Sequence, residues 1–160
     1  MKTLRNIILV VITIIIISNN AIAYDMCVDG IYYNKLSDGG NNEKRAEVTY
    51  FRLFNNIITN FYQGDIVIPD TIVVKISTTP LRYATYHVIG ISKWAFANSE
   101  GLVSITLPPS IQSIGYGAFA YCDSLNYILF KGKTPPTIDN GSLVGVRLYV
   151  PCGCINTYVN

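Results

Sequence analysis

Residues 88–110 read VIGISKWAFANSEGLVSITLPPS, and residues 111–133 read IQSIGYGAFAYCDSLNYILFKGK. Laid over each other at an offset of 23, the two stretches match at eight apolar positions, among them Ala95-Phe96-Ala97 over Ala118-Phe119-Ala120. Self-similarity at a period of roughly 20 to 50 residues is typical of a solenoid, because one such unit cannot bury its apolar face alone. The sequence therefore predicts a stack of repeats, each as long as this offset.

Each repeat is expected to hold one strand and one short helical turn. Residues 104–107 alternate polar and apolar side chains, which is the pattern of a half-buried strand, and Pro108 ends it because proline cannot donate to the ladder. Residues 127–130 repeat the pattern in the second unit. The Ala-Phe-Ala segment within residues 93–98 is expected to form the helical turn. In the second repeat Gly115 stands at the entrance of this turn, where it would supply a positive φ.

The flanking segments are predicted to be degenerate repeats and caps. Residues 65–69 and 147–151 each repeat the strand-then-proline pattern. Residues 26–34 and 46–51 are expected to form a meander around a polar turn at 38–42, which would cover the open end of the stack. The predicted organisation is a signal peptide at 1–23, an N-terminal β cap at 24–63, repeats at 64–151 with a hairpin insertion at 72–89, and a C-terminal tail at 152–160.

The second repeat carries a recognisable motif, Ile-x-x-Ile-Gly-x-x-Ala-Phe-x-x-Cys-x-x-Leu at residues 111–125. This motif resembles the BspA-type leucine-rich repeat of bacterial surface proteins. Residues 28–34 are similar to the usual start of such domains, and residues 134–137 and 149–153 to their usual end. The first repeat departs from the motif with serine in place of both its glycine and its cysteine. The resemblance implies a leucine-rich-repeat solenoid, mostly β, with a role in adhesion.

The segment that precedes Tyr24 has the features of a cleaved export signal. Lys2 and Arg5 precede an apolar run at residues 7–17, and Ala21-Ile22-Ala23 provides the small-x-small pattern of a signal-peptidase site. The run is shorter than the roughly 20 residues that a spanning helix needs. We therefore expect cleavage after Ala23, no membrane span after cleavage, and a secreted or cell-surface protein. A retained membrane anchor is the alternative.

The charge of the remaining chain bears on its partners. Removing residues 1–23 takes two of the twelve basic residues and none of the ten acidic ones, so the net charge becomes 10 − 10 = 0. Nucleic-acid binding rests on many contacts between basic side chains and phosphates. A neutral chain is therefore not expected to bind nucleic acid.

Four cysteines follow the signal: Cys27, Cys122, Cys152 and Cys154. Export permits disulfides, and four cysteines allow three complete pairings that the sequence does not distinguish. Cys122 takes the place that Ser99 fills one repeat earlier, which favours a small buried residue. A metal site is not expected, because the chain has a single histidine and no second cysteine pair at ligand spacing.

The sequence offers no set of residues that predicts catalysis. His87 is the only histidine, and its place in a predicted hairpin strand favours a surface residue over a general base. The ten acidic residues are scattered, mostly in turns, whereas glycoside hydrolysis needs two carboxylates across a cleft. Trp94 is interpreted as a partly exposed packing residue, with ligand stacking as the alternative. We expect neither an enzyme nor a cofactor.

The outward faces of the predicted strands provide the candidate binding residues. If Ile105 and Ile128 point inward, then period-2 alternation directs their neighbours outward in two columns. Tyrosine, arginine and exposed aliphatic side chains fit the composition of a recognition patch. The candidate binding residues are Asp65, Val67, Ser104, Thr106, Tyr127, Leu129, Arg147 and Tyr149.

The functional hypothesis is a secreted or cell-surface module that binds a protein or a glycan. The alternative is a structural or assembly subunit of a surface complex, and an enzyme ranks a distant third. The sequence alone does not identify the partner or the oligomeric state.

Overall fold

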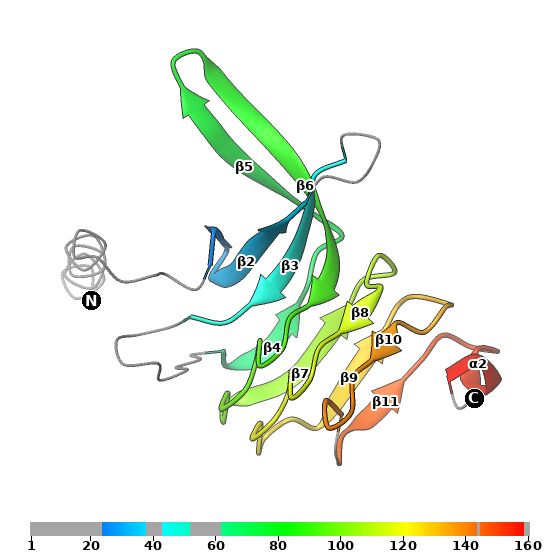
Figure 1. The fold of residues 1–160 in the computed structure, drawn as a ribbon. Helices are drawn as coiled ribbons and strands as arrows, with labels where there is room; N and C mark the ends of the chain where they lie inside the picture. The colour runs from blue at the N-terminus through cyan, green and yellow to red at the C-terminus, as the bar shows by residue number, and fades with distance from the viewer. Residues whose placement is uncertain (1–23, 38–42, 52–61, 144, 159–160) are drawn as a thin grey trace.

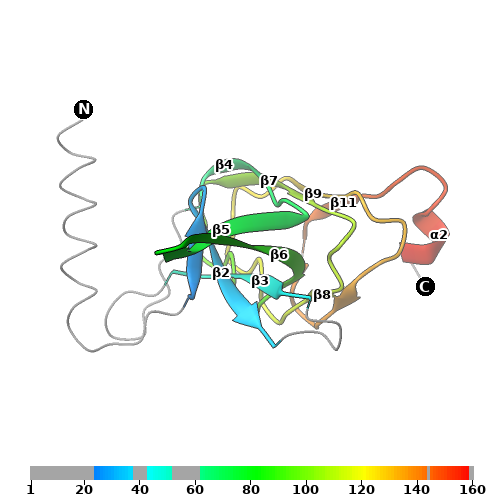
Figure 2. The ribbon, with the colours of Figure 1, turned by 90° about the horizontal axis from the view of Figure 1, so that it is seen from above.

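The computed structural model describes residues 24–37, 43–51, 62–143 and 145–158. The predicted signal peptide and the polar turn at 38–42 therefore lie outside the described residues. Within the described part the chain forms two sheets, one of seven strands and one of four. Figure 2 shows the four-stranded sheet on one side of the molecule and strands of the seven-stranded sheet on the other, with the chain crossing between them.

An antiparallel meander starts the fold, as the N-terminal cap of the sequence analysis. It consists of β1 (Met26–Val28), β2 (Ile31–Leu36) and β3 (Arg45–Thr49), and each strand pairs with the next. A two-residue turn joins β1 to β2, because Asp29 and Gly30 both have positive φ, at 51° and 81°. Such a turn matches the twist of a hairpin. The chain then returns through β3, which pairs in parallel with β6 (Leu81–Ile91) and so joins the cap to the repeats.

Parallel strands form the body of the molecule. The four-stranded sheet contains β4 (Gly64–Val67), β7 (Leu102–Leu107), β9 (Tyr127–Phe130) and β11 (Arg147–Tyr149), all parallel. In the other sheet β6 is followed by β8 (Ser113–Ile114) and β10 (Thr137–Ile138), also in parallel. Ile105 lies beside Ile128 in this register, which is the offset of 23 seen in the sequence. The expectation of a mostly β repeat fold is confirmed, and the structure shows that the repeated strands are parallel (Figure 1).

The expected helical turn in each repeat is wrong. Residues 93–98 form overlapping turns instead, in which the N–H groups of Ala95 and Ala97 donate to carbonyls three residues back. The N–H groups that alternate with these two donate to the next repeat, as Phe96 does to the carbonyl of Ala118 at 2.8 Å. A helix would direct all of these donors along its own axis. The turns therefore close each repeat and also link it to the next one through hydrogen bonds.

The positive φ expected at Gly115 lies elsewhere. Near the start of each turn the left-handed residue is Gly117, with φ of 61°, or its counterpart Trp94, with φ of 60°. A second matched pair, Asn98 and Tyr121, follows with φ of 60° and 57°. Gly115 is required for a different reason, since a Cβ there would lie 2.5 Å from the backbone nitrogen of Lys93 in the preceding repeat. Ser92, at the equivalent place, lies instead beside the cap and donates its N–H to the carbonyl of Val48.

The core lies between the two sheets and is built from matched positions. Ile105, Ile128 and Phe96 are fully buried, and Phe119 is 5% exposed. Leu148 on β11, the last strand of the four-stranded sheet, aligns with Ile128 but is 41% exposed. The end of the stack at β11 is therefore only partly covered. The short helix α2 (Ile155–Tyr158) lies near this end, and the hydroxyl of Tyr158 donates to the carbonyl of Gly132 at 2.8 Å.

A long hairpin projects from the body, in the place where a hairpin insertion is expected at 72–89. It is formed by β5 (Thr71–Thr78) and the first part of β6, paired from Thr71 opposite His87 to Thr78 opposite Leu81. Figure 1 shows it extending beyond the other strands of the molecule.

Candidate functional site

The four-stranded sheet brings the eight candidate residues together in two columns. Strand register places Asp65, Ser104, Tyr127 and Arg147 side by side, and Val67, Thr106, Leu129 and Tyr149 beside them. Both columns face away from the core, because the intervening residues Ile105 and Ile128 are fully buried. Neighbouring strands lie about 4.8 Å apart, so the columns span about 14 Å from β4 to β11.

Aromatic and aliphatic side chains form the centre and one end of this surface. The rings of Tyr127 and Tyr149 meet edge to face with centroids 5.3 Å apart. Tyr149 is 52% exposed and Val67 is 60% exposed, whereas Thr106 and Leu129 are half-buried. Aromatic side chains in this arrangement offer a large contact area with little rotamer entropy to lose on binding.

Ser104 differs from the other candidates in its burial. It faces outward with its column but is only 4% exposed, since its neighbours cover it. Its hydroxyl donates to the Asp65 carboxylate at 2.5 Å. Ser104 therefore positions Asp65 and is not itself available for contact. We call the remaining seven residues the strand-face patch, namely Asp65, Val67, Thr106, Tyr127, Leu129, Arg147 and Tyr149.

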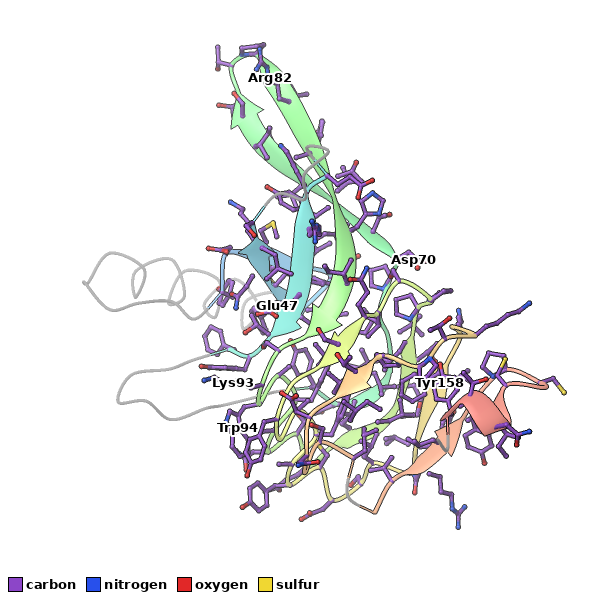
Figure 3. The ribbon with its side chains drawn as sticks, turned by 45° about the vertical axis from the view of Figure 1, so that its right-hand side comes forward. Glu47, Asp70, Arg82, Lys93, Trp94 and Tyr158 are labelled. Atoms are coloured by element: carbon purple, nitrogen blue, oxygen red, sulfur yellow. The ribbon has the colours of Figure 1, made fainter. Side chains whose placement is uncertain are left out.

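The turn side of the repeats holds a second aromatic group. Trp94 is half-buried, and its six-membered ring lies over Gly117, where a Cβ would come within 2.6 Å of it. The ring of Tyr116 meets that of Trp94 at 5.2 Å, edge to face. Trp94 thus covers the backbone of the next repeat, and Gly117 is needed beneath it. Figure 3 places Trp94 at the edge of the molecule, close to Lys93.

The described cysteines are not bonded to each other. Cys27 and Cys152 are exposed, and Cys122 and Cys154 are half-buried. The Cys122 thiol donates to the carbonyl of Phe96 at 3.1 Å, and burial raises its pKa to about 11. Cys122 thus links the second repeat to the first, but it is half-buried and not the buried residue that the sequence predicts.

Titratable groups in the described residues do not gather into a reactive cluster. His87 is exposed and lies in register between Arg45 and Thr71, on the other sheet from the strand-face patch. No group of three or more histidine, cysteine, aspartate or glutamate side chains lies close enough to hold a metal among these residues. No helix of the described chain is long and apolar enough to cross a membrane.

The sequence analysis missed one exposed surface. The hairpin carries four large apolar side chains that are about half exposed or more: Val73, Ile76, Leu81 and Tyr83. The alternation of Leu81 and Tyr83 with Arg82 and Ala84 is typical of a strand, but this pattern alone does not show that the hairpin leaves the body.

Parallel strands in register, repeated at one constant offset and closed by turns, define a leucine-rich-repeat fold. Residues 76–145 match the family described as "BspA type Leucine rich repeat region (6 copies)". These residues are similar to BspA-type leucine-rich repeats, as the motif at 111–125 predicts. A comparison with curated proteins gave no match.

Three solved structures share the fold. A leucine rich cell surface protein from Faecalibacterium prausnitzii A2-165 aligns over 84% of this chain at 17% identity, with a TM-score of 0.54. A leucine-rich repeat protein from Bacteroides ovatus ATCC 8483 aligns over 80% at 24% identity, also at 0.54. This chain covers only 31% and 30% of those two chains. A leucine-rich repeat protein from Bacteroides capillosus ATCC 29799 aligns over 79% at 20% identity with a TM-score of 0.50, and 97% of it is covered.

Proposed function

We propose that this protein is a secreted or cell-surface recognition module that binds a protein or a glycan through the strand-face patch. The observation that carries the proposal is the perpendicular pair formed by the half-buried Tyr127 and the exposed Tyr149, beside Leu129 and Arg147. Exposed aromatic and arginine side chains are the residues most enriched at the centres of binding surfaces. The description of the Faecalibacterium protein as a cell surface protein supports the location.

The dimensions of the patch favour a small ligand or a short segment of a larger one. A typical protein interface takes about 20 to 30 residues from each partner. Seven residues over about 14 Å are far fewer. A glycan of a few units, or a protruding loop of a protein, would match this surface.

The charges of the patch support binding over catalysis. Asp65 and Arg147 lie at opposite ends of one column, with Ser104 and Tyr127 between them. Three strand spacings separate their backbones by about 14 Å. The two groups can therefore orient a polar ligand at its ends, and they are too far apart to act together on one bond.

A second candidate function, a subunit of a surface assembly, is favoured by the end of the stack. Leu148 and Ile138 occupy the last rungs of the two sheets and are 41% and 39% exposed. Solenoid ends normally need a polar cap. Self-association that Leu148→Asn abolishes, measured by analytical ultracentrifugation, would favour this role.

The test of recognition begins with the exported protein immobilised against glycan arrays and surface extracts. The affinity for a captured partner is then measured for wild type and for the double variant Tyr127→Ala with Tyr149→Ala. We expect a loss of at least about tenfold, because truncation of two aromatic residues at an interface centre usually exceeds that. The control, Tyr116→Ala with Tyr121→Ala, removes two tyrosines that are 53% and 71% exposed on the turn side. Equal losses in both double variants would remove the patch from the function.

A further inference from the structure

The hairpin of β5 and β6 has one face that nothing in the described chain covers. We call residues 71–87 the hairpin arm. Within the arm's part of β6 the buried side chains are Ala84 and Tyr86, and the alternating residues Leu81 and Tyr83 face the opposite way and are exposed. Alternation places Arg82 on the face of Ala84, at the tip where no described residue covers it. Tyr83 pairs with Lys75 on this exposed face. An isolated two-stranded hairpin is at best marginally stable in water, so this part of the arm gains from a covering partner.

Apolar side chains are spread along the exposed part of the arm. Val73 is 59% exposed, Leu81 is 57% exposed and Tyr83 is 60% exposed. Ile76 is 49% exposed and lies where the register shifts between Lys75 and Ser77. Large exposed apolar side chains grouped on a protruding element indicate a site of interaction.

The arm is also the cationic part of a nearly neutral protein. No acidic residue occurs between Asp70 and Glu100, whereas Lys75 and Arg82 both lie on the arm. Both basic side chains are exposed. Figure 3 shows Arg82 at the tip, with Asp70 and Glu47 well below it. The acidic groups nearest the base of the arm therefore do not neutralise its positive charge. This charge attracts an anionic partner.

The free edge of β5 does not suit strand pairing with another chain. Among the described strands β5 pairs with β6 alone. Its outer edge carries Lys75 and a register shift next to it, and lysines and bulges are the features by which edge strands avoid pairing. The exposed face of the arm, with its apolar side chains, is therefore the surface available for a partner.

We propose that the hairpin arm attaches the protein to a lipid bilayer with anionic headgroups. Val73, Leu81 and Tyr83 enter the interfacial layer, and Lys75 on the same face contacts headgroup phosphates. Arg82, on the opposite face at the tip, reaches the headgroup layer from the other side of the hairpin. Apolar burial combined with attraction to anionic lipid is what holds peripheral elements on membranes. Tyrosine is enriched at this depth, and long basic side chains keep their charged ends in the headgroup layer. A soluble acidic polymer would satisfy the two cations but leave the apolar side chains in water.

The attachment would leave the strand-face patch accessible. Figure 1 shows the arm pointing away from the body, and the patch lies on the other sheet from β6. The arm thus accounts for retention at a membrane surface independently of what the patch binds.

The proposal is tested by co-sedimentation with vesicles. The exported protein is used after natural processing, because an uncleaved apolar run at residues 7–17 would itself bind lipid. We expect binding to vesicles of phosphatidylcholine and phosphatidylglycerol in equal parts, weak binding to phosphatidylcholine alone, and release by salt. Each basic residue near an anionic surface contributes about fivefold to affinity. The double variant Lys75→Glu with Arg82→Glu should therefore lose more than about tenfold.

Two further variants separate the apolar contribution from the charge. Leu81→Thr with Tyr83→Thr keeps residues that favour strands and should also weaken binding at least about tenfold. The matched controls are Lys131→Glu with Lys133→Glu, a charge reversal at exposed sites off the arm, and Ile155→Thr, which removes a comparably exposed apolar residue from α2. Circular dichroism verifies that each variant folds. Wild-type protein that does not sediment with anionic vesicles, or arm variants that sediment as wild type does, overturns the proposal. Equal affinity for polyglutamate and for anionic vesicles also overturns it, because the arm would then serve an acidic polymer.

Discussion

The rings of Phe96 and Phe119 stack with centroids 5.3 Å apart and planes inclined by only 11°. The two residues occupy the same place in successive repeats, and both are buried. Because each ring covers the next, neither repeat can close its core alone. The offset of 23 residues in the sequence thus places these two rings in direct contact.

Phe119→Ala is expected to lower the free energy of unfolding by about 3–5 kcal/mol, through lost burial and the cavity left behind. Denaturation in urea measures the loss. Phe119→Leu, which retains most of the apolar volume, should lose clearly less. A loss below about 1 kcal/mol for the alanine variant would mean that the ring does not hold the repeats together.

Gly115→Ala is expected to destabilise the protein by about 1–3 kcal/mol, because the new methyl group would lie 2.5 Å from the backbone nitrogen of Lys93. Gly101→Ala serves as its control, since there the methyl group meets only the flexible side chain of Gln63 at 3.0 Å. The midpoints of thermal unfolding of the two variants should differ clearly. Equal midpoints would contradict the close approach of the repeats at Gly115.

Tyr33→Phe and Tyr62→Phe form a matched pair. Both side chains are buried, but the Tyr33 hydroxyl has no hydrogen-bond partner among the described residues. The Tyr62 hydroxyl donates to the carbonyl of Thr49 and accepts from the N–H of Tyr32. Removing an unpaired buried hydroxyl is neutral or stabilising, whereas losing paired groups costs about 1–3 kcal/mol. Urea denaturation should therefore give opposite or clearly unequal changes, and similar losses in both would contradict the hydrogen bonding described.

Cys122 is expected to react slowly with iodoacetamide near neutral pH. Burial raises its pKa to about 11, and only the thiolate is the nucleophile. Its alkylation rate should keep rising as the pH approaches 11, since a raised pKa delays formation of the thiolate. Peptide mass mapping compares it with the exposed Cys152 in the same sample. Reaction of Cys122 as fast as Cys152 at neutral pH, or its quantitative recovery in a disulfide, would contradict its place between the repeats.

Repetition made the strands and their register predictable. Eight apolar matches fix which residues face the core, and alternation then assigns the outward columns without further information. The turns were harder to predict, because Ala-Phe-Ala suits a helix equally well and only the hydrogen bonds to the next repeat decide against it. Likewise the need for Gly115 comes from the backbone of Lys93, which belongs to the preceding repeat and is remote in sequence.

Burial within the outward columns was not predictable from alternation. Ser104 follows the pattern, yet its neighbours on β4 and β9 cover it. The Asp29-Gly30 turn was missed although its sequence is a known hairpin signal, because the whole segment 26–34 was interpreted as one strand. The burial of a small residue such as Ser104 depends on the sizes of its neighbours on adjacent strands. These neighbours are far away in the sequence, so local patterns do not predict the burial.

The register of β9 determines which of its residues face the core and which belong to the strand-face patch. A test of this register is therefore the most direct test of both. Ile128 is fully buried, whereas Tyr127 faces outward beside the exposed Tyr149. The measurement is the free energy of unfolding in urea for Ile128→Ala and for Tyr127→Ala with Tyr149→Ala. We predict a loss of about 2–5 kcal/mol for Ile128→Ala and about 1 kcal/mol or less for the double variant. A collapse of stability in the double variant, with Ile128→Ala tolerated, would contradict the account, because a shift of one residue exchanges the two faces of the strand.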